Sequence, residues 1–216
     1  MEKYSDNTMP SPDDTRDWIV ESIYKPGISV PDFVDHSKHL QPIRDQGNQG
    51  SCAAQTAACM KEWQEYYDIG YNNYMSPQFI YNNRINQDSD GMFGRDVMRI
   101  LSKIGCCFEI TYPYNLIESP SDMDMSPIIQ ANKYKIKAYA QIKTIDGLKK
   151  ALHLNGPCYI SFPIFNHSPT MWKPNDGEKR IGGHAMTVVG YDNNCFKIRN
   201  SWGKFWGDEG YCYYSY

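Results

Sequence analysis

The sequence predicts an α+β protein whose first half is mainly helical and whose second half is mainly sheet. The first half contains alanine-rich and amphipathic segments that end at glycines. The second half contains runs of β-branched and aromatic residues, which favour strands. With 216 residues, of which 41% are hydrophobic and 22% charged, the chain can bury a sizeable core. We therefore expect two lobes with a cleft between them.

Three helices are expected in the first half. Residues 51–67 start at a serine that can cap a helix, contain several alanines and are followed by Gly70, which can end one. Residues 77–86 begin with a proline, which suits the first helical position. Residues 96–104 carry apolar side chains at helical spacing and precede Gly105.

The second half is expected to form a sheet. Residues 134–142 alternate in polarity, which indicates a strand, and residues 145–154 read as a short helix stopped by the Asn-Gly-Pro at 155–157. Four further strands are predicted at residues 158–165, 184–191, 195–199 and 210–214.

The domain organisation is predicted from polarity. Residues 1–29 are polar and proline-marked, without a core periodicity, so they read as an amino-terminal arm. Residues 30–216 are expected to form one domain, with a helical lobe at about 30–130 and a β lobe at about 131–216.

Composition argues against several classes of protein. A net charge of -3 does not favour nucleic acid as a partner, and no apolar run approaches the roughly 18 residues that cross a membrane. The first residues lack the basic and apolar pattern of a secretory signal. The seven cysteines contain no C-x-x-C pair, and most read as small buried hydrophobic residues. We expect an intracellular or virion-associated protein in a reducing compartment.

One cysteine stands out from the others. The loop at residues 46–51, Gln-Gly-Asn-Gln-Gly-Ser, delivers Cys52 to the start of the first predicted helix. Unpaired N–H groups and the helix dipole favour negative charge there, so we expect its thiol to ionise more easily than a free thiol of pKa about 8.5. A structural cysteine is the alternative, but it would gain nothing from a polar, glycine-containing loop. Cys52 is therefore a candidate nucleophile.

A histidine and an asparagine are candidate partners of this cysteine. His184 opens an apolar strand after two glycines, and Asn200 follows a predicted strand and precedes Trp202. An asparagine amide can hold an imidazole in one tautomer, and a tryptophan can keep water off that hydrogen bond. An isolated histidine is more often a structural residue, and this interpretation applies to His36, His39, His153 and His167.

The spacing of these residues points to a known family. The histidine follows the cysteine by 132 residues (184 − 52) and the asparagine by 148 (200 − 52). Both separations lie within the roughly 130–150 residues of papain-type enzymes. With the motifs Gln46-Gly47, Gly50-Ser51-Cys52, Gly183-His184-Ala185 and Asn200-Ser201-Trp202-Gly203, the chain resembles the papain family of cysteine peptidases, cathepsins included, over most of its length. Its likeness is greatest to compact members from bacteria and large DNA viruses.

The resemblance implies a papain-like two-lobe fold, with a helical left lobe and a β-barrel-like right lobe on either side of the active-site cleft. It also implies an endopeptidase that hydrolyses peptide bonds through a thioester. Cys52 would be the nucleophile, His184 the general acid and base, Asn200 the orienting residue and Gln46 an oxyanion donor. Residues 112–132 lack the histidine pair of carboxydipeptidase loops, which favours an endopeptidase.

Substrates and partners follow from the same resemblance. Substrates would be peptides or proteins, and no metal or organic cofactor is implied. Residues 1–29 are far shorter than most family propeptides, and two readings stay open: a short, self-inhibiting propeptide that covers the cleft, or an arm without this role. Phe93, Ser161, Gly182 and Ala185 would line the pocket for the second residue before the cut. They are uncharged and fairly apolar, which favours an apolar or aromatic side chain. The residues that the resemblance assigns to substrate binding are Gly50, Gly91, Met92, Phe93, Ser161, Gly182, Gly183, Ala185 and Trp202.

The chain also departs from the usual family pattern. Gln49 and Ser89 stand where the family usually has two bridged cysteines, and Ala53 replaces the usual aromatic residue after the nucleophile. Two alternatives stay open from the sequence. One is an inactive papain-like protein with a binding or structural role, and the other is a peptide ligase or transpeptidase that uses the same thioester.

Overall fold

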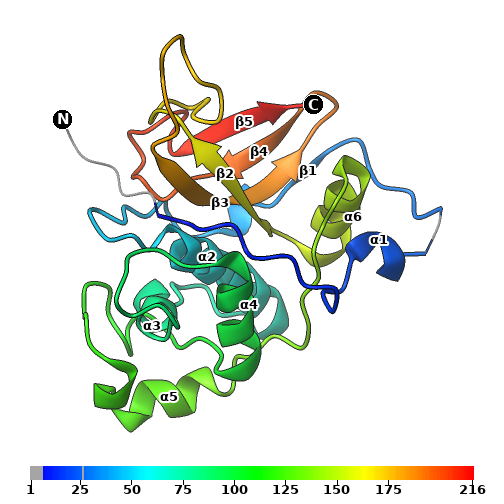
Figure 1. Ribbon diagram of the computed structural model, residues 1–216. Coiled ribbons are helices and arrows are strands. Elements are labelled where there is room, and N and C mark those ends of the chain that lie inside the picture. The colour runs from blue at the N-terminus through cyan, green and yellow to red at the C-terminus, as the bar shows by residue number, and fades with distance from the viewer. Residues whose placement is uncertain (1–6, 26) are drawn as a thin grey trace.

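The computed structural model describes residues 7–25 and 27–216, so residues 1–6 of the predicted arm and residue 26 lie outside the described residues. The helices between residues 52 and 131 gather in one lobe and the strands form the other, while the arm crosses the molecule between them (Figure 1). The predicted α+β class is therefore confirmed. The α-helices are α1 (Val20–Ile23), α2 (Cys52–Ile69), α3 (Pro77–Asn82), α4 (Gly94–Lys103), α5 (Met125–Ala131) and α6 (Ile145–Asn155), and two 3-10 helices span Ser37–His39 and Pro120–Asp122.

Helix α2 forms the centre of the molecule. Its alanines are fully buried, because one face of the helix packs on strand β3 and another face packs on α3 and α4. Gly70 ends the helix in a left-handed conformation, with φ of 70°, as the sequence predicted. Ser51 precedes the helix but does not cap it with its side chain, because its hydroxyl lies 2.6 Å from the hydroxyl of Tyr114.

The second lobe is an antiparallel sheet with β3 at its centre. Strand β3 pairs with β1, β2 and β4, and β4 pairs with β5, so the sheet curls around a core of apolar side chains. The strands are β1 (Val34–Asp35), β2 (Cys158–Ile164), β3 (Gly182–Tyr191), β4 (Cys195–Arg199) and β5 (Tyr211–Ser215).

One predicted strand is wrong. Residues 134–142 alternate in polarity, yet they form an extended loop in which none of the residues is buried. Gln141 makes one isolated bridge to Ile19 of the arm, and the N–H of Ile136 donates to Leu101. A strand needs a neighbour of comparable length, and the arm supplies one only at a single residue.

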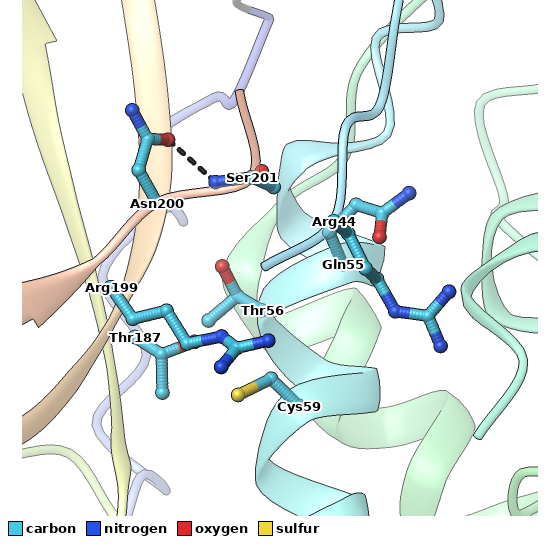
Figure 2. A pocket seen from close by; sticks show the side chains of 8 residues that line it. All are labelled: Arg44, Gln55, Thr56, Cys59, Thr187, Arg199, Asn200 and Ser201. Atoms are coloured by element: carbon cyan, nitrogen blue, oxygen red, sulfur yellow. Dashed lines mark hydrogen bonds between the residues drawn. The ribbon is translucent and has the colours of Figure 1, made fainter. Parts of the chain in front are cut away.

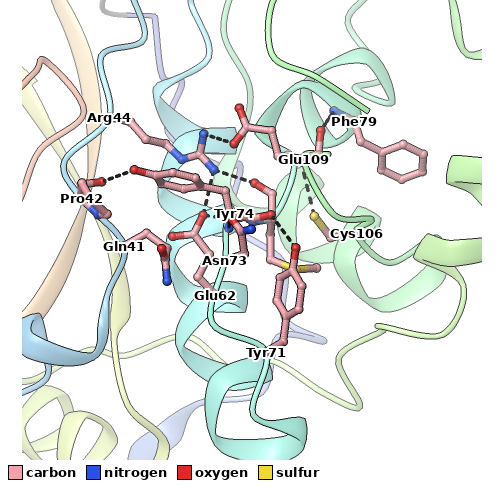
Figure 3. A network of polar contacts seen from close by, with 12 residues as sticks. Gln41, Pro42, Arg44, Glu62, Tyr71, Asn73, Tyr74, Phe79, Cys106 and Glu109 are labelled. Carbon is pink, nitrogen blue, oxygen red and sulfur yellow. Dashed lines mark hydrogen bonds and ion pairs between the residues drawn. The ribbon is translucent and has the colours of Figure 1, made fainter. Parts of the chain in front are cut away.

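The segment before Cys52 is anchored to both lobes by Arg44. The Arg44 side chain forms ion pairs with Glu62 of α2 at 2.9 Å and with Glu109 at 2.6 Å, and its guanidinium lies 4.0 Å from the ring centre of Tyr74 (Figure 3). Its carbonyl accepts a hydrogen bond from Gly203, which belongs to the β lobe. Arg44 therefore fixes the start of the 45–51 loop against the neighbouring segment of the other lobe.

The cysteines agree with the sequence expectation that most are buried, whereas the helix expected at 77–86 ends at Asn82. All seven cysteines are free thiols, and only Cys195 is partly exposed. The usual family disulfide is absent, as Gln49 and Ser89 require. Among the described residues, no helix combines the length and the apolar character needed to cross a membrane.

Candidate active site

Cys52 occupies the first position of helix α2 and is fully buried. Two N–H groups of the core donate to its sulfur, that of Ala53 from the same helix and that of Ala185 from β3. The next residue after His184 therefore touches the thiol, so the register of β3 brings the histidine to Cys52 across the two lobes.

His184 is held by Asn200, which follows strand β4. The ring nitrogen Nε2 lies 2.6 Å from Asn200 Oδ1. The backbone N–H of Ser201 donates to the same Oδ1 at 2.8 Å, which fixes the amide with its oxygen toward the ring. Nε2 must then carry the proton and donate it to Asn200. Proton exchange with Cys52 would therefore use the other ring nitrogen, Nδ1.

Trp202 covers this hydrogen bond. Its ring stacks on the His184 ring, with ring centres 4.1 Å apart and an angle of 26° between the planes. Trp206 packs edge-on against Trp202, and both tryptophans are buried. Excluding water strengthens the bond between His184 and Asn200 and keeps the imidazole in one orientation.

Gln46 is oriented by Ser201. The Ser201 hydroxyl donates to Gln46 Oε1 at 2.7 Å, and the Gln46 N–H donates to the Ser201 carbonyl at 2.9 Å. The Gln46 side-chain amide nitrogen donates to Gln49 of its own loop at 3.0 Å. A side-chain amide is a hydrogen-bond donor, so Gln46 has the chemistry to stabilise an oxyanion beside Cys52.

The arm lies in the cleft over Cys52. Thr8 donates its N–H to Gly183 at 2.8 Å, and Met9 donates its N–H to Met92 at 3.2 Å. Met9 also pairs in a parallel bridge with Phe93. The arm therefore uses the backbone of Met92, one of the residues that the resemblance assigns to substrate binding.

The arm directs a backbone N–H, rather than a carbonyl carbon, toward the nucleophile. The N–H of Asn7 donates to the Cys52 sulfur, while the Asn7 carbonyl packs against Gly91. A Cβ at Gly91 would lie 1.5 Å from that oxygen, and the φ of 82° at this residue also requires glycine. The Asn7 carbonyl is directed toward Gly91, so the arm occupies the site without being aligned for attack.

The ionisation of Cys52 differs from the sequence expectation. Burial raises the pKa of the Cys52 thiol, and the N–H groups of Ala185, Asn7 and Ala53 and the Thr8 hydroxyl offset this only in part. The sequence suggested a thiol that ionises more easily than usual. That expectation left out the burial of Cys52, which is fully enclosed in the core between the lobes, and burial disfavours the thiolate.

A small cavity lies behind Asn200 and Ser201, between this segment and α2 (Figure 2). Its volume of ≈ 10 Å³ holds about one water molecule. It is therefore too small for a peptide, and it is separate from the cleft that the arm fills. Its walls are formed by Arg44, Gln55, Thr56, Cys59, Thr187, Arg199, Asn200 and Ser201.

The structure brings the predicted catalytic residues Cys52, His184, Asn200 and Gln46 to one place. The predicted substrate-binding residues flank them. In the β2–β3 ladder Ser161 pairs with Ala185 and Gly182 pairs with Ile164, and Ala185 and Trp202 lie beside Cys52 and His184. The residues that lie against the arm are Gly50, Gly91, Met92, Phe93 and Gly183.

Sequence reasoning missed some residues of the site. Ser201 is part of a family motif, but the motif does not indicate that this residue positions both Gln46 and Asn200. Thr8 and Tyr159 were not considered, although their hydroxyls lie 3.3 Å apart beside Cys52. Strand alternation places Tyr159 on the same face as Ser161, so this signal was present in the sequence.

A cysteine at a helix start, facing a histidine–asparagine pair on a sheet across a cleft, defines a cysteine protease of the papain type. Comparison with known families agrees, because residues 30–216 match the model described as "Papain family cysteine protease". The chain belongs to this family.

Individual relatives support the assignment. A peptidase C1-like protein of Acanthamoeba polyphaga mimivirus is 31% identical, over 77% of this chain and 62% of its own. A cathepsin L-like peptidase of Aedes aegypti is 28% identical, over 85% of this chain and 58% of its own. The crystal structure of xylellain, a cysteine protease from Xylella fastidiosa, is 28% identical with a TM-score of 0.83, over 98% of this chain and 90% of that one. The chain thus spans about 60% of the length of these two curated relatives.

Proposed function

We propose that this protein is a cysteine endopeptidase that acts through a thioester on Cys52. One observation carries the proposal: His184 is held by Asn200 at 2.6 Å, while the next residue, Ala185, donates its N–H to the Cys52 sulfur. A buried structural cysteine does not need an oriented imidazole and a shielding tryptophan beside it. The arrangement provides a nucleophile, a base and a group that orients the base.

In the first step, the Cys52 thiolate attacks the carbonyl carbon of the scissile bond. The C–N bond then breaks, and protonated His184 gives its proton to the departing amine, which leaves the acyl group on sulfur. In the second step, His184 takes a proton from water as the water attacks the thioester. The acid leaves, and the cysteine is restored.

The negative charge on the carbonyl oxygen needs donors during both steps. Gln46 would supply its side-chain amide and Cys52 its backbone N–H. The hydrogen bonds from Ser201 and to Gln49 hold the Gln46 amide in place before a substrate arrives. One such donor contributes about 3 kcal/mol, or about a hundredfold in rate.

Residues 1–29 would hold this enzyme inactive. The support is the arm's position: residues 7–9 fill the cleft, the Asn7 carbonyl faces Gly91, and the cover raises the pKa of the Cys52 thiol. Displacing the arm would admit water to the sulfur, lower the pKa of the thiol and free the backbone of Met92 for a substrate.

The test is labelling of the full-length protein with a cysteine-directed epoxide, followed by peptide mapping. Because the arm covers Cys52, the labelling is measured in full-length Thr8→Arg, in which the added side chain displaces the arm. There we expect one fast-reacting site, Cys52, which is lost when Cys52→Ala is added and slowed when His184→Ala is added. Cys195→Ala is the matched control, because Cys195 is the most exposed thiol and would dominate if exposure alone set reactivity. Preferential labelling of Cys195, or a rate at Cys52 that does not depend on His184, would refute the proposal.

A further inference from the structure

Tyr159 lies beneath the cleft, and its role follows from its place on strand β2. Ser161 pairs with Ala185 and Tyr159 with Thr187, so the side chains of Tyr159 and Ser161 project from the same face of the sheet. This face packs against the core of the helical lobe, which includes Cys52, Met92 and Ala185. Tyr159 therefore extends the wall that Ser161 and Ala185 begin, toward the bottom of the predicted pocket.

Helix α4 leaves room for the Tyr159 ring. A Cβ at Gly94 would lie 3.2 Å from a ring carbon of Tyr159, so the missing side chain lets the ring pack closely on the helix start. Phe93, which precedes Gly94, is one of the four residues predicted to line the pocket for the second residue before the cut. The ring of Tyr159 thus lies at the base of that same pocket.

The Tyr159 hydroxyl contacts the arm and no other described hydrogen-bonding group. Its one partner among the described residues is the Thr8 hydroxyl, at 3.3 Å. The Thr8 oxygen also lies 3.5 Å from the Met92 carbonyl, and its hydrogen bond to the Cys52 sulfur lowers the pKa of that thiol. A hydroxyl has a single hydrogen, so when Thr8 donates to Cys52 or Met92 its oxygen accepts from Tyr159.

Removing the arm would leave a phenol hydroxyl without a protein partner at the bottom of an otherwise apolar pocket. Burial raises the pKa of Tyr159, so this hydroxyl keeps its proton and remains a donor. A polar group in such a place discriminates strongly, because a ligand that cannot pair with it leaves it unsatisfied. Thr8, which is 5% exposed, shows the size and chemistry that fit.

We propose that Tyr159 is a specificity-determining residue that selects a hydroxyl-bearing side chain, threonine above all, at the second residue before the scissile bond. This inference rests on the proposed function and names its substrate preference. The sequence favours an apolar or aromatic side chain at this position, because the four predicted lining residues are uncharged and fairly apolar. Tyr159 adds a phenol hydroxyl to them. The arm, in this view, holds the cleft with a threonine that imitates the preferred substrate side chain.

The preference is tested with two peptidyl epoxides that differ only in threonine or valine at that position. Valine has the shape of threonine without the hydroxyl. Both compounds meet the same arm on the full-length protein, so the ratio of their labelling rates at Cys52 reports the pocket alone. We expect about a tenfold advantage for threonine in the wild type, falling to about one in Tyr159→Phe.

Equal rates for the two epoxides, or a threonine advantage that survives in Tyr159→Phe, would overturn the inference. If a simple epoxide without a peptide still labels Cys52 in a His184-dependent manner, the proposed function stands while the specificity fails.

A second measurement does not depend on catalysis. Hydrogen–deuterium exchange of residues 7–25 is compared between full-length Thr8→Ser, which keeps a hydroxyl, and Thr8→Val, which does not. The proposal requires faster exchange in Thr8→Val and in Tyr159→Phe, with no further gain when the two changes are combined. Equal exchange in Thr8→Ser and Thr8→Val would contradict it.

Discussion

The two parts of the arm hold the body of the protein by different kinds of contact. The inner part, residues 7–9, sits in the cleft and uses backbone hydrogen bonds to Gly183 and Met92 and one threonine hydroxyl. The outer part, residues 11–24, adds two carboxylates to neutral contacts such as its backbone hydrogen bonds with Gln141. Asp17 pairs with Arg95 at the start of α4, and Glu21 accepts from the segment that starts α6.

The two parts of the arm therefore differ in their effect on the closure of the cleft. The inner contacts involve no carboxylate and no basic side chain, so salt acts on them only weakly. The two carboxylate contacts of the outer part depend on ionised groups at partly or fully exposed positions. Acid therefore weakens the hydrogen bonds that Glu21 accepts, and salt screens the ion pair of Asp17. The inner part therefore determines how well the cleft is closed, and the outer part determines under which conditions it stays closed.

The largest effect is expected from the inner part. Thr8 is 5% exposed between the two lobes, so Thr8→Arg places a long, charged side chain where there is no room. Overpacking of this kind costs about 1–3 kcal/mol, which corresponds to about a 5- to 100-fold shift toward the open arm. We expect Cys52 to be labelled faster by that factor at neutral pH.

Thr15→Arg is the matched control, because Thr15 is an exposed residue of the same arm. It should leave the labelling rate unchanged. If Thr8→Arg labels no faster than Thr15→Arg, the inner part does not close the cleft, and the comparison between the two parts of the arm fails.

A smaller, pH-dependent effect is expected from Glu21. Its pKa is lowered from 4.5: partial burial acts to raise it, but the Thr144 hydroxyl and the N–H groups of Lys143 and Thr144 outweigh this. The pKa of Glu21 is lower in the closed state than the 4.5 expected in the open arm. Ionised Glu21 therefore stabilises the closed state above about pH 4.5. This stabilisation is lost as the pH falls through the lower, closed-state value.

The ratio of the Cys52 labelling rate in Glu21→Gln to that in the wild type should therefore exceed one at pH 7 and approach one as the pH falls below the lowered, closed-state pKa of Glu21. Glu178→Gln is the control, because the pKa of Glu178 is lowered in the same direction, chiefly by the N–H of Asn175, in a loop outside the arm. A ratio that does not change with pH would show that Glu21 is not an acid-sensitive contact.

The contrast between the two parts also shows what the sequence could predict. Local signals were sufficient for α2, because the alanines and Gly70 lie within one segment. The strand β4 was predicted with its observed ends, Cys195 and Arg199. The predicted strand at 134–142 failed because alternation describes one chain segment, while a strand also depends on a neighbour, which is absent here.

The same limit applies to the site. The positions of Cys52, His184 and Asn200 could be inferred from motif and spacing, and the structure brings them together. The environment of the sulfur could not, because Cys52 is fully buried and the groups that act on the pKa of its thiol include Asn7 and Thr8, which are distant in sequence. Nothing in the sequence around Thr8 signals that its hydroxyl would meet Tyr159, since only the fold places them 3.3 Å apart.

The smallest effect is expected from the ion pair between Asp17 and Arg95. Both side chains are partly exposed, at 20% and 26%, and such pairs contribute about 0.2–1 kcal/mol. Asp17→Asn should therefore raise the labelling rate of Cys52 by no more than about fivefold, and 1 M salt should remove most of the difference. Asp14→Asn is the control, because Asp14 pairs with Arg16 inside the arm and does not reach the body through that pair. An Asp17→Asn effect as large as that of Thr8→Arg would mean that the outer part, rather than the inner part, determines how tightly the cleft is closed.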